Sequence, residues 1–128
     1  MVEEKEILKR DERLDTRQVT PELINYIVEK IVREVAPVQI ILFGSRARGS
    51  AKADSDIDLF IVHDSQTTNR LLRRKIDGLF WGRRFGVDLI VRSPDDVKFN
   101  MEDNNPFYTR HIFKEGKMLY ERPKQTTS

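Results

Sequence analysis

The chain has 128 residues, 34% of them charged, and a net charge of only +2. This length fits one domain with one core, and the small net charge does not commit the protein to nucleic acid. The chain has no cysteine, which excludes disulfides, thiolate metal sites and a cysteine nucleophile. No apolar run approaches the roughly 20 residues that span a bilayer, and the charged start is unlike a signal peptide. We therefore expect a cytoplasmic protein.

The first part of the chain is charged and then helical. Residues 1–18 mix acids and bases, and because such runs usually stay solvated, we expect a charged N-terminal arm, with a partner-binding helix as the alternative. Residues 20–22, Thr-Pro-Glu, predict a helix start with threonine as N-cap and proline in the first turn. Apolar side chains recur at helical spacing over residues 23–35, and Pro37 ends this helix.

Three short apolar runs predict the strands of a small sheet. They are residues 38–43, 56–62 and 85–91. Residues 46–53 are expected to form a short helix or a tight loop. A longer helix is expected from residue 67 or 68 to residue 81, with Leu71 on its inner face and Gly82 as its C-cap.

The last third of the chain predicts two helices and an edge strand. A serine-proline start predicts a helix over residues 95–101, followed by a helix over residues 107–114 and an edge strand over residues 117–121. Residues 122–128 are expected to be a disordered polar tail, which leaves a domain over residues 19–121. The alternation of elements predicts an α/β (α+β) fold with a small sheet flanked by helices; whether all strands are parallel stays open.

Three aspartates provide the chemistry. In a strand, Asp56 and Asp58 point to the same face, and Asp88 is the polar member of an alternating apolar strand. Asp-x-Asp alone could simply face water. If the strands are neighbours, however, the three carboxylates share a face and repel each other unless a cation lies between them. Oxygen ligands favour Mg²⁺ or Mn²⁺, and three carboxylates can hold two such ions roughly 4 Å apart.

A glycine-serine turn precedes these acids. Glycine lets a ligand approach the backbone closely, and the N–H groups of a helix start bind anions, so Gly44 and Ser45 are candidates for binding a nucleotide's phosphates. Arg46 and Arg48 can neutralise phosphate charge. Each feature alone would favour a solvated turn, and their combination with the aspartates is the specific signal.

Ten residues separate Ser45 from Asp56, which gives the pattern Gly-Ser-x10-Asp-x-Asp, with a further aspartate on a later strand. This pattern resembles that of the DNA polymerase β-like nucleotidyltransferase superfamily, and most closely its minimal nucleotidyltransferases (the MNT group). The resemblance implies a mixed sheet flanked by helices, with ATP as nucleotide donor. It implies that Gly44 and Ser45 bind the triphosphate. It further implies that Asp56 and Asp58 hold Mg²⁺ ions, and that Asp88 is a third carboxylate, which orients a metal or takes the proton of the acceptor hydroxyl.

The resemblance also implies a partner. Small MNT chains are typically paired with a HEPN-domain ribonuclease toxin, and they act as antitoxins by transferring AMP to a tyrosine of that toxin. The alternatives are transfer to a small hydroxylated molecule such as an aminoglycoside, and a non-catalytic antitoxin that blocks its partner by binding. Nucleic-acid contact through the basic residues 70–84 is not favoured but stays open, as does a homodimer. His63 is expected in a loop, and His111 has no assigned role.

Overall fold

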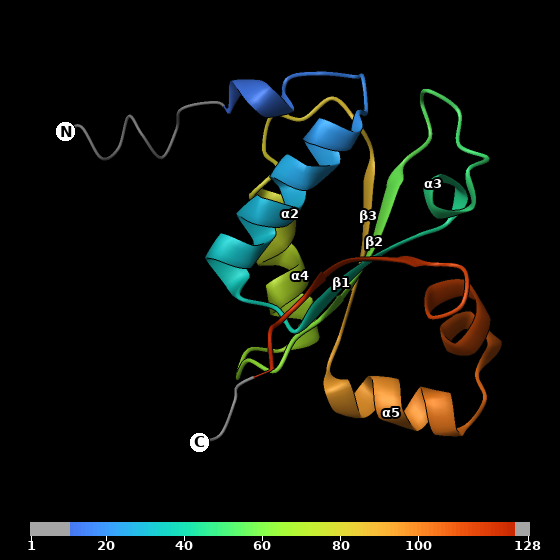
Figure 1. Ribbon diagram of the computed structural model, residues 1–128. Coiled ribbons are helices and arrows are strands. Elements are labelled where there is room, and N and C mark those ends of the chain that lie inside the picture. Colours follow the sequence, from blue (N-terminus) through green and yellow to red (C-terminus); the bar gives the residue numbers. More distant parts are fainter. Residues whose placement is uncertain (1–10, 125–128) are drawn as a thin grey trace.

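A four-stranded sheet with the strand order β3-β2-β1-β4 forms the centre of the protein. The computed structural model describes residues 11–124 (Figure 1). The strands are β1 (Gln39–Phe43), β2 (Ile57–Val62), β3 (Val87–Arg92) and β4 (Lys117–Glu121). β1 is antiparallel to both β2 and β4, whereas β2 and β3 are parallel. The sheet is therefore mixed, which confirms the expected fold class, and the last strand lies at an edge as predicted.

Helices cover both faces of this sheet. They are η1 (Glu12–Leu14), α2 (Pro21–Val35), α3 (Ser45–Arg48), α4 (Asn69–Gly78), α5 (Pro94–Glu102) and the π-helix η2 (Phe107–Ile112). Figure 1 shows α2 and α4 on one side of the sheet and α3 and α5 on the other. Within residues 11–124, no helix is long and apolar enough to cross a lipid bilayer.

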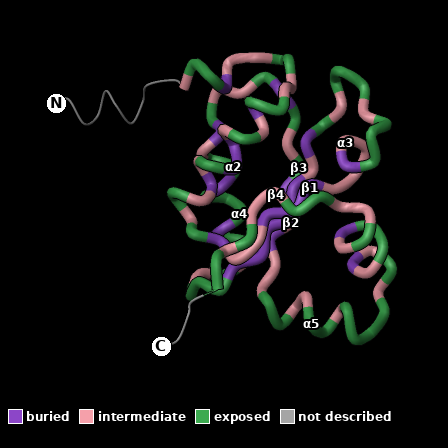
Figure 2. Tube along the Cα trace, viewed as in Figure 1, coloured by how far each residue is buried: buried purple, intermediate pink, exposed green. Residues whose placement is uncertain are grey.

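The sheet separates two apolar clusters. The larger one lies beneath α2 and α4 and includes Ile27, Leu59 and Ile76. The smaller one lies on the opposite face, where Phe60 packs against side chains of η2 such as Tyr108. Figure 2 shows the buried positions concentrated along the central strands. Burial on both faces explains why β2 is almost continuously apolar.

Local signals set the helix starts as predicted. The Thr20 hydroxyl accepts a hydrogen bond from the Leu23 N–H at 3.1 Å, and α2 ends at Ala36 in the left-handed conformation. At the start of α5, the side chains of Ser93 and Asp96 form a reciprocal capping box. These helix starts need no tertiary contact, because the side chain that caps the helix lies next to it in sequence.

α4 differs from its prediction in two ways. It ends at Gly78 with Leu79 as its C-cap, whereas Gly82 lies in the following turn with φ 89°. Leu71 is 55% exposed instead of inward-facing. Leu72 and Ile76 are the buried residues of α4, because residues four apart lie on one helix face and Leu71 is rotated away from that face.

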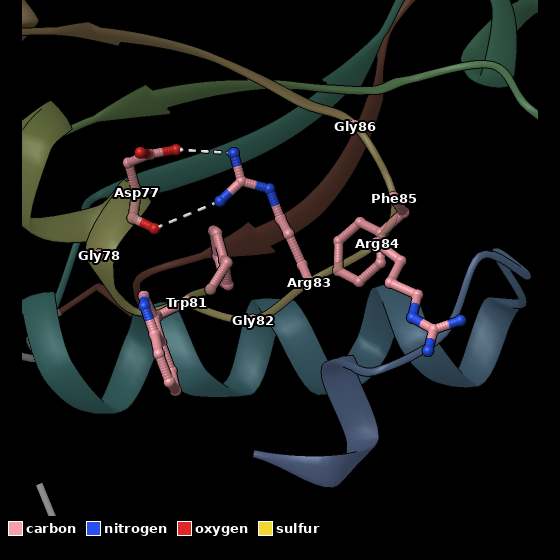
Figure 3. Close-up of a pocket in the computed structure, with 9 residues that line it drawn as sticks. Asp77, Gly78, Trp81, Gly82, Arg83, Arg84, Phe85 and Gly86 are labelled. Atoms are coloured by element: carbon pink, nitrogen blue, oxygen red, sulfur yellow. Dashed lines mark hydrogen bonds and ion pairs between the residues drawn. The ribbon is translucent and has the colours of Figure 1, made fainter. Parts of the chain in front are cut away.

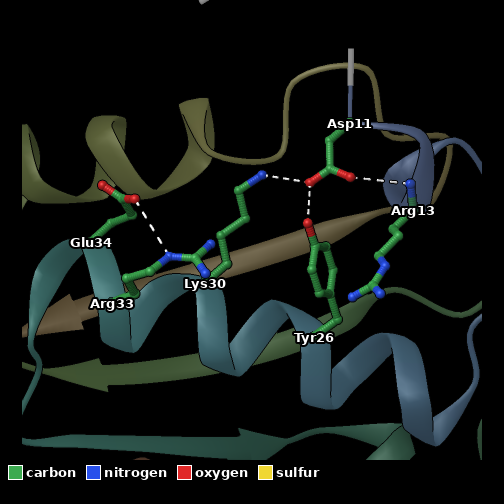
Figure 4. A network of polar contacts seen from close by, with 6 residues as sticks. All are labelled: Asp11, Arg13, Tyr26, Lys30, Arg33 and Glu34. Atoms are coloured by element: carbon green, nitrogen blue, oxygen red, sulfur yellow. Dashed lines mark hydrogen bonds and ion pairs between the residues drawn. The ribbon is translucent and has the colours of Figure 1, made fainter. Parts of the chain in front are cut away.

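The start of the described chain packs onto α2. Leu14 is fully buried in the larger cluster. The Asp11 carboxylate accepts hydrogen bonds from the Tyr26 hydroxyl and from Lys30 Nζ, the latter at 2.7 Å (Figure 4). Burial alone would raise the pKa of Asp11, but these hydrogen bonds hold it below its usual value. Residues 11–18 are therefore folded against the domain and are not a solvated arm, while the rest of the expected arm lies outside the described residues.

The other end of the chain is also tied down. Arg122 donates to the Asp64 carboxylate at 2.7 and 3.0 Å and to the Ala36 carbonyl at 2.6 Å. The expected disordered tail therefore does not begin at Arg122, and residues 125–128 lie outside the described part of the chain.

Two leucine-to-alanine changes test the role of the N-terminal segment. Leu14→Ala should lower the free energy of unfolding by about 2–5 kcal/mol, because it leaves a cavity in the core. Leu71→Ala removes the same atoms from the surface and should change it by no more than about 0.5 kcal/mol. Urea denaturation followed by circular dichroism measures both. Similar losses for the two variants would show that residues 11–18 do not contribute to the core.

Candidate active site

β2 and β3 bring two of the predicted carboxylates together. Asp58 and Asp88 are paired positions in the parallel register, so their side chains share a face on strands about 4.8 Å apart. Asp56 lies one residue before β2, not inside it as expected. Asp58 is half-buried, whereas Asp56 and Asp88 are exposed. The carboxylates therefore lie at the open edge of the sheet, where β2 and β3 begin.

Two glycines make room for these carboxylates. Gly44 has φ 76°, and a Cβ at this position would collide with Asp58 Oδ2. A Cβ on Gly86 would likewise collide with Asp56 Oδ1. Gly86 is a site residue that the sequence interpretation missed. Its only signal is a glycine two residues before Asp88, directly before the same strand.

The glycine-serine turn lies beside Asp58. β1 ends at Phe43, whose register partner on β2 is Asp58, and Gly44 and Ser45 follow at once. The N–H groups of Ala47 and Arg48 both donate to the Gly44 carbonyl at 3.1 Å, so α3 is a single helical turn that begins at the site. The structure thus brings the predicted phosphate-binding turn and the predicted metal-binding carboxylates to one place.

The two predicted phosphate-binding arginines make other contacts. The Arg46 guanidinium donates to the Ser55 carbonyl at 2.6 and 3.2 Å and to two further carbonyls, at residues 52 and 53, at 3.4 Å. It therefore holds the loop that leads into Asp56. Arg48 is exposed, and its Nη1 lies 4.0 Å from Glu115 Oε2. A role for either arginine in binding phosphate stays a prediction.

A family model described as "Polymerase beta, Nucleotidyltransferase" matches residues 25–125. The chain belongs to this family. The match covers most of the chain and includes the glycine-serine turn and all three aspartates, so this protein is a nucleotidyltransferase.

A curated relative and one solved structure agree with this assignment. A Methanocaldococcus jannaschii protein named "Putative protein adenylyltransferase" is 34% identical over 89 residues, which are 64% of this chain and 77% of that protein. The crystal structure of "a putative nucleotidyltransferase" from Sulfolobus solfataricus matches with a TM-score of 0.54 and 26% identity, over 79% of each chain. A crystal structure described as "the toxin-antitoxin with AMP-PNP" matches with a TM-score of 0.49 and 20% identity, over 77% of this chain and 73% of that one.

Electrostatic repulsion from the other two candidate carboxylates acts on Asp58. Burial, Asp88 and Asp56 raise the pKa of Asp58, in that order, and Arg48 and Arg46 offset only part of the increase. Charging this carboxylate is therefore unfavourable in the folded protein, and a bound cation would relieve the repulsion.

The donor set fits a hard divalent cation. Asp56, Asp58 and Asp88 offer only carboxylate oxygens, which Mg²⁺ and Mn²⁺ prefer. Within residues 11–124, no three or more histidine, cysteine or acidic side chains already form a metal-binding group. The fit therefore rests on the chemistry of the donors and on the raised pKa of Asp58.

His63 does not belong to this site. It lies just after the far end of β2 and is buried. Its Nδ1 lies 2.8 Å from Ser65 Oγ and its Nε2 lies 2.7 Å from Asn69 Oδ1. As expected, His63 lies in the loop after β2, and its ring contacts join the end of β2 to the start of α4.

Two glycine-to-alanine changes test whether catalysis needs the Asp56 carboxylate at its present position. Gly86→Ala should displace the Asp56 carboxylate and lower the rate of nucleotidyl transfer at least about 10-fold, since a shift of about 1 Å in a catalytic group can cost 100-fold. Gly78→Ala is the control, because a Cβ there meets nothing within 4 Å. Transfer rates and melting temperatures of both variants should be compared. An active Gly86→Ala enzyme would mean that Asp56 need not occupy this position.

The raised pKa of Asp58 also predicts how stability depends on pH. A carboxylate whose pKa is higher in the folded state binds more protons there, so its contribution to stability falls as pH rises from its usual value of 3.8 through the raised one. Asp58→Asn should therefore raise the melting temperature at pH 7 in EDTA, and the gain should shrink toward pH 3.5. Asp54→Asn, in the exposed loop, should leave it unchanged. A lower melting temperature for Asp58→Asn at pH 7 would contradict this.

Proposed function

We propose that this nucleotidyltransferase moves AMP from ATP onto a hydroxyl group of a partner protein. The observation that carries the proposal is the register of Asp58 beside Asp88, with the Gly44–Ser45 turn next to them. The family match gives the reaction class. The relative named a protein adenylyltransferase supports both the adenylyl group and a protein acceptor.

The residues divide the reaction between them. Gly44 and Ser45 bind the triphosphate, with the backbone of the turn close to the phosphate oxygens. Asp56, Asp58 and Asp88 would hold Mg²⁺ or Mn²⁺, two ions on this proposal, which would stabilise the charge on the attacking and leaving oxygens. The acceptor hydroxyl attacks the α-phosphorus in line, and a phosphate ester forms as the bond to pyrophosphate breaks. Asp88, exposed on the outer strand, also takes the proton of that hydroxyl on this proposal.

We further propose that the acceptor is a tyrosine of a HEPN-domain ribonuclease toxin and that the protein is an antitoxin in the cytoplasm. The support is the resemblance of the Gly-Ser-x10-Asp-x-Asp pattern to MNT antitoxins. A tyrosine hydroxyl is an acceptor that a partner can present at an open site, and the carboxylates lie at an exposed edge of the sheet.

The test uses ATP labelled at the α-phosphate, Mg²⁺ and the product of the neighbouring gene, which the proposal expects to be a HEPN-domain toxin. The wild-type protein should label the toxin, and EDTA should stop labelling. Asp58→Ala should lower labelling at least about 100-fold, because transition-state charge is no longer stabilised. Asp54→Ala, an acid in the exposed loop, should leave it intact. Replacement of the toxin's acceptor tyrosine by phenylalanine should remove the label.

Two results would overturn this proposal. Toxin neutralisation that survives Asp58→Ala, with no label on the toxin, would make the protein a binding antitoxin. Labelling of an aminoglycoside without any protein partner would make it a small-molecule transferase.

A further inference from the structure

Three aromatic side chains, Phe43, Phe107 and His111, lie in a row over the sheet face that carries Asp58. We call this row the aromatic column. Phe43 is the register partner of Asp58, and paired residues of neighbouring strands share a face. The Phe43 and Phe107 rings meet edge to face with centroids 5.8 Å apart. The His111 ring lies 6.2 Å from the Phe107 ring at an interplanar angle of 40°. His111 is exposed, so the column runs from the catalytic carboxylate to solvent.

Charged groups tie the top of this column to the site. Glu115 Oε2 lies 3.6 Å from His111 Nδ1 and 4.0 Å from Arg48 Nη1. Arg48 belongs to the turn of α3 that begins at the site, and its charge acts on Asp58. The Phe107 and His111 rings both belong to η2, a π-helix, and π-helical turns are frequent at functional sites. His111 is therefore held at the border of the catalytic centre.

The geometry of in-line transfer indicates which part of the donor nucleotide would meet the aromatic column. Across the sheet, the Gly44–Ser45 turn follows β1, Asp58 lies on β2 and Asp88 lies on the outer strand β3. In-line transfer places the leaving pyrophosphate and the attacking hydroxyl on opposite sides of the α-phosphorus. Pyrophosphate at the turn thus places the acceptor on the β3 side. Phe43 and Phe107 lie over the sheet face that carries Asp58, so a base that extends from the α-phosphorus along this face on the β1 side would meet them.

We propose that the nucleobase of the donor stacks on the His111 ring, with Phe107 supporting it from behind. This inference rests on the proposed function, because it takes the triphosphate to bind at Gly44–Ser45. Aromatic rings bind any nucleobase through its π-face, and the exposed edge of the column offers such a surface at the side of the site.

Trp81 is another exposed aromatic side chain that could stack on a base, but it lies on the sheet face opposite to the aromatic column. It is 60% exposed and lines a cleft of ≈ 580 Å³ together with Arg83 and Arg84. The buried lining residues of that cleft, Phe80 and Phe85, belong to the cluster beneath α2 and α4, and Figure 3 shows Trp81 with the residues that line the cleft. The aromatic column lies on the other face, so Trp81 provides a matched aromatic control.

Calorimetric titration with ATP and with inorganic tripolyphosphate, in Mg²⁺ and without acceptor, separates the base from the phosphates. His111→Ala should weaken ATP binding about 10-fold, the range of a lost base–aromatic stack, and leave tripolyphosphate binding unchanged. His111→Phe should restore ATP binding, since it keeps a ring. Arg110→Ala, on the exposed side of η2, and Trp81→Ala should bind ATP like the wild type.

Other outcomes overturn the inference in distinguishable ways. Unchanged ATP binding by His111→Ala would remove His111 from the donor site while leaving the proposed function intact. Equal weakening of ATP and tripolyphosphate would show that His111 acts on the phosphates, and failure of phenylalanine to restore binding would show that the imidazole nitrogens are needed. Wild-type protein that binds neither ligand would overturn the proposed function together with this inference.

Discussion

Mutual repulsion of carboxylates at one edge of the sheet is the constraint on which the site depends. Parallel pairing of β2 and β3 places Asp58 directly beside Asp88, and burial of Asp58 makes its charge unfavourable. Nothing in the apolar core requires this arrangement, and it opposes folding at neutral pH. Its chemical value lies in the affinity that such a cluster has for a divalent cation and for the phosphates that the cation binds.

Strand directions explain why the predicted phosphate-binding turn meets these acids. Because β1 is antiparallel to β2, the end of β1 lies at the same edge of the sheet as the start of β2. Because β3 is parallel to β2, it begins at that edge too. Gly44 and Gly86 then allow carboxylates to lie where side chains would otherwise be, and Arg46 holds the loop before Asp56. The apolar clusters fix the sheet, and the polar residues occupy the edge beyond them.

The two sides of this edge differ in chemistry. On the β1 side, Arg48 and Glu115 lie beside the aromatic rings of Phe107 and His111. On the β3 side, Asp88 is exposed on an outer strand. In the proposed mechanism, the first side takes the planar base of the nucleotide, and the second leaves access for a large acceptor. A donor held on one side and an acceptor admitted from the other is the arrangement that in-line transfer requires.

The sequence by itself determined the elements and the chemistry, because both depend on neighbouring residues: the Thr20 cap, the apolar runs, and an Asp-x-Asp spacing that strand alternation turns into a shared face. Only the tertiary structure decided what depends on contacts between distant residues. The β2–β3 register places Asp88 beside Asp58. The role of Gly86 is the absence of a Cβ next to a carboxylate thirty positions earlier in the chain. A guanidinium can donate to phosphates or to carbonyls, so the sequence leaves both partners open for Arg46. The path of the loop before Asp56 brings backbone carbonyls within reach of its side chain.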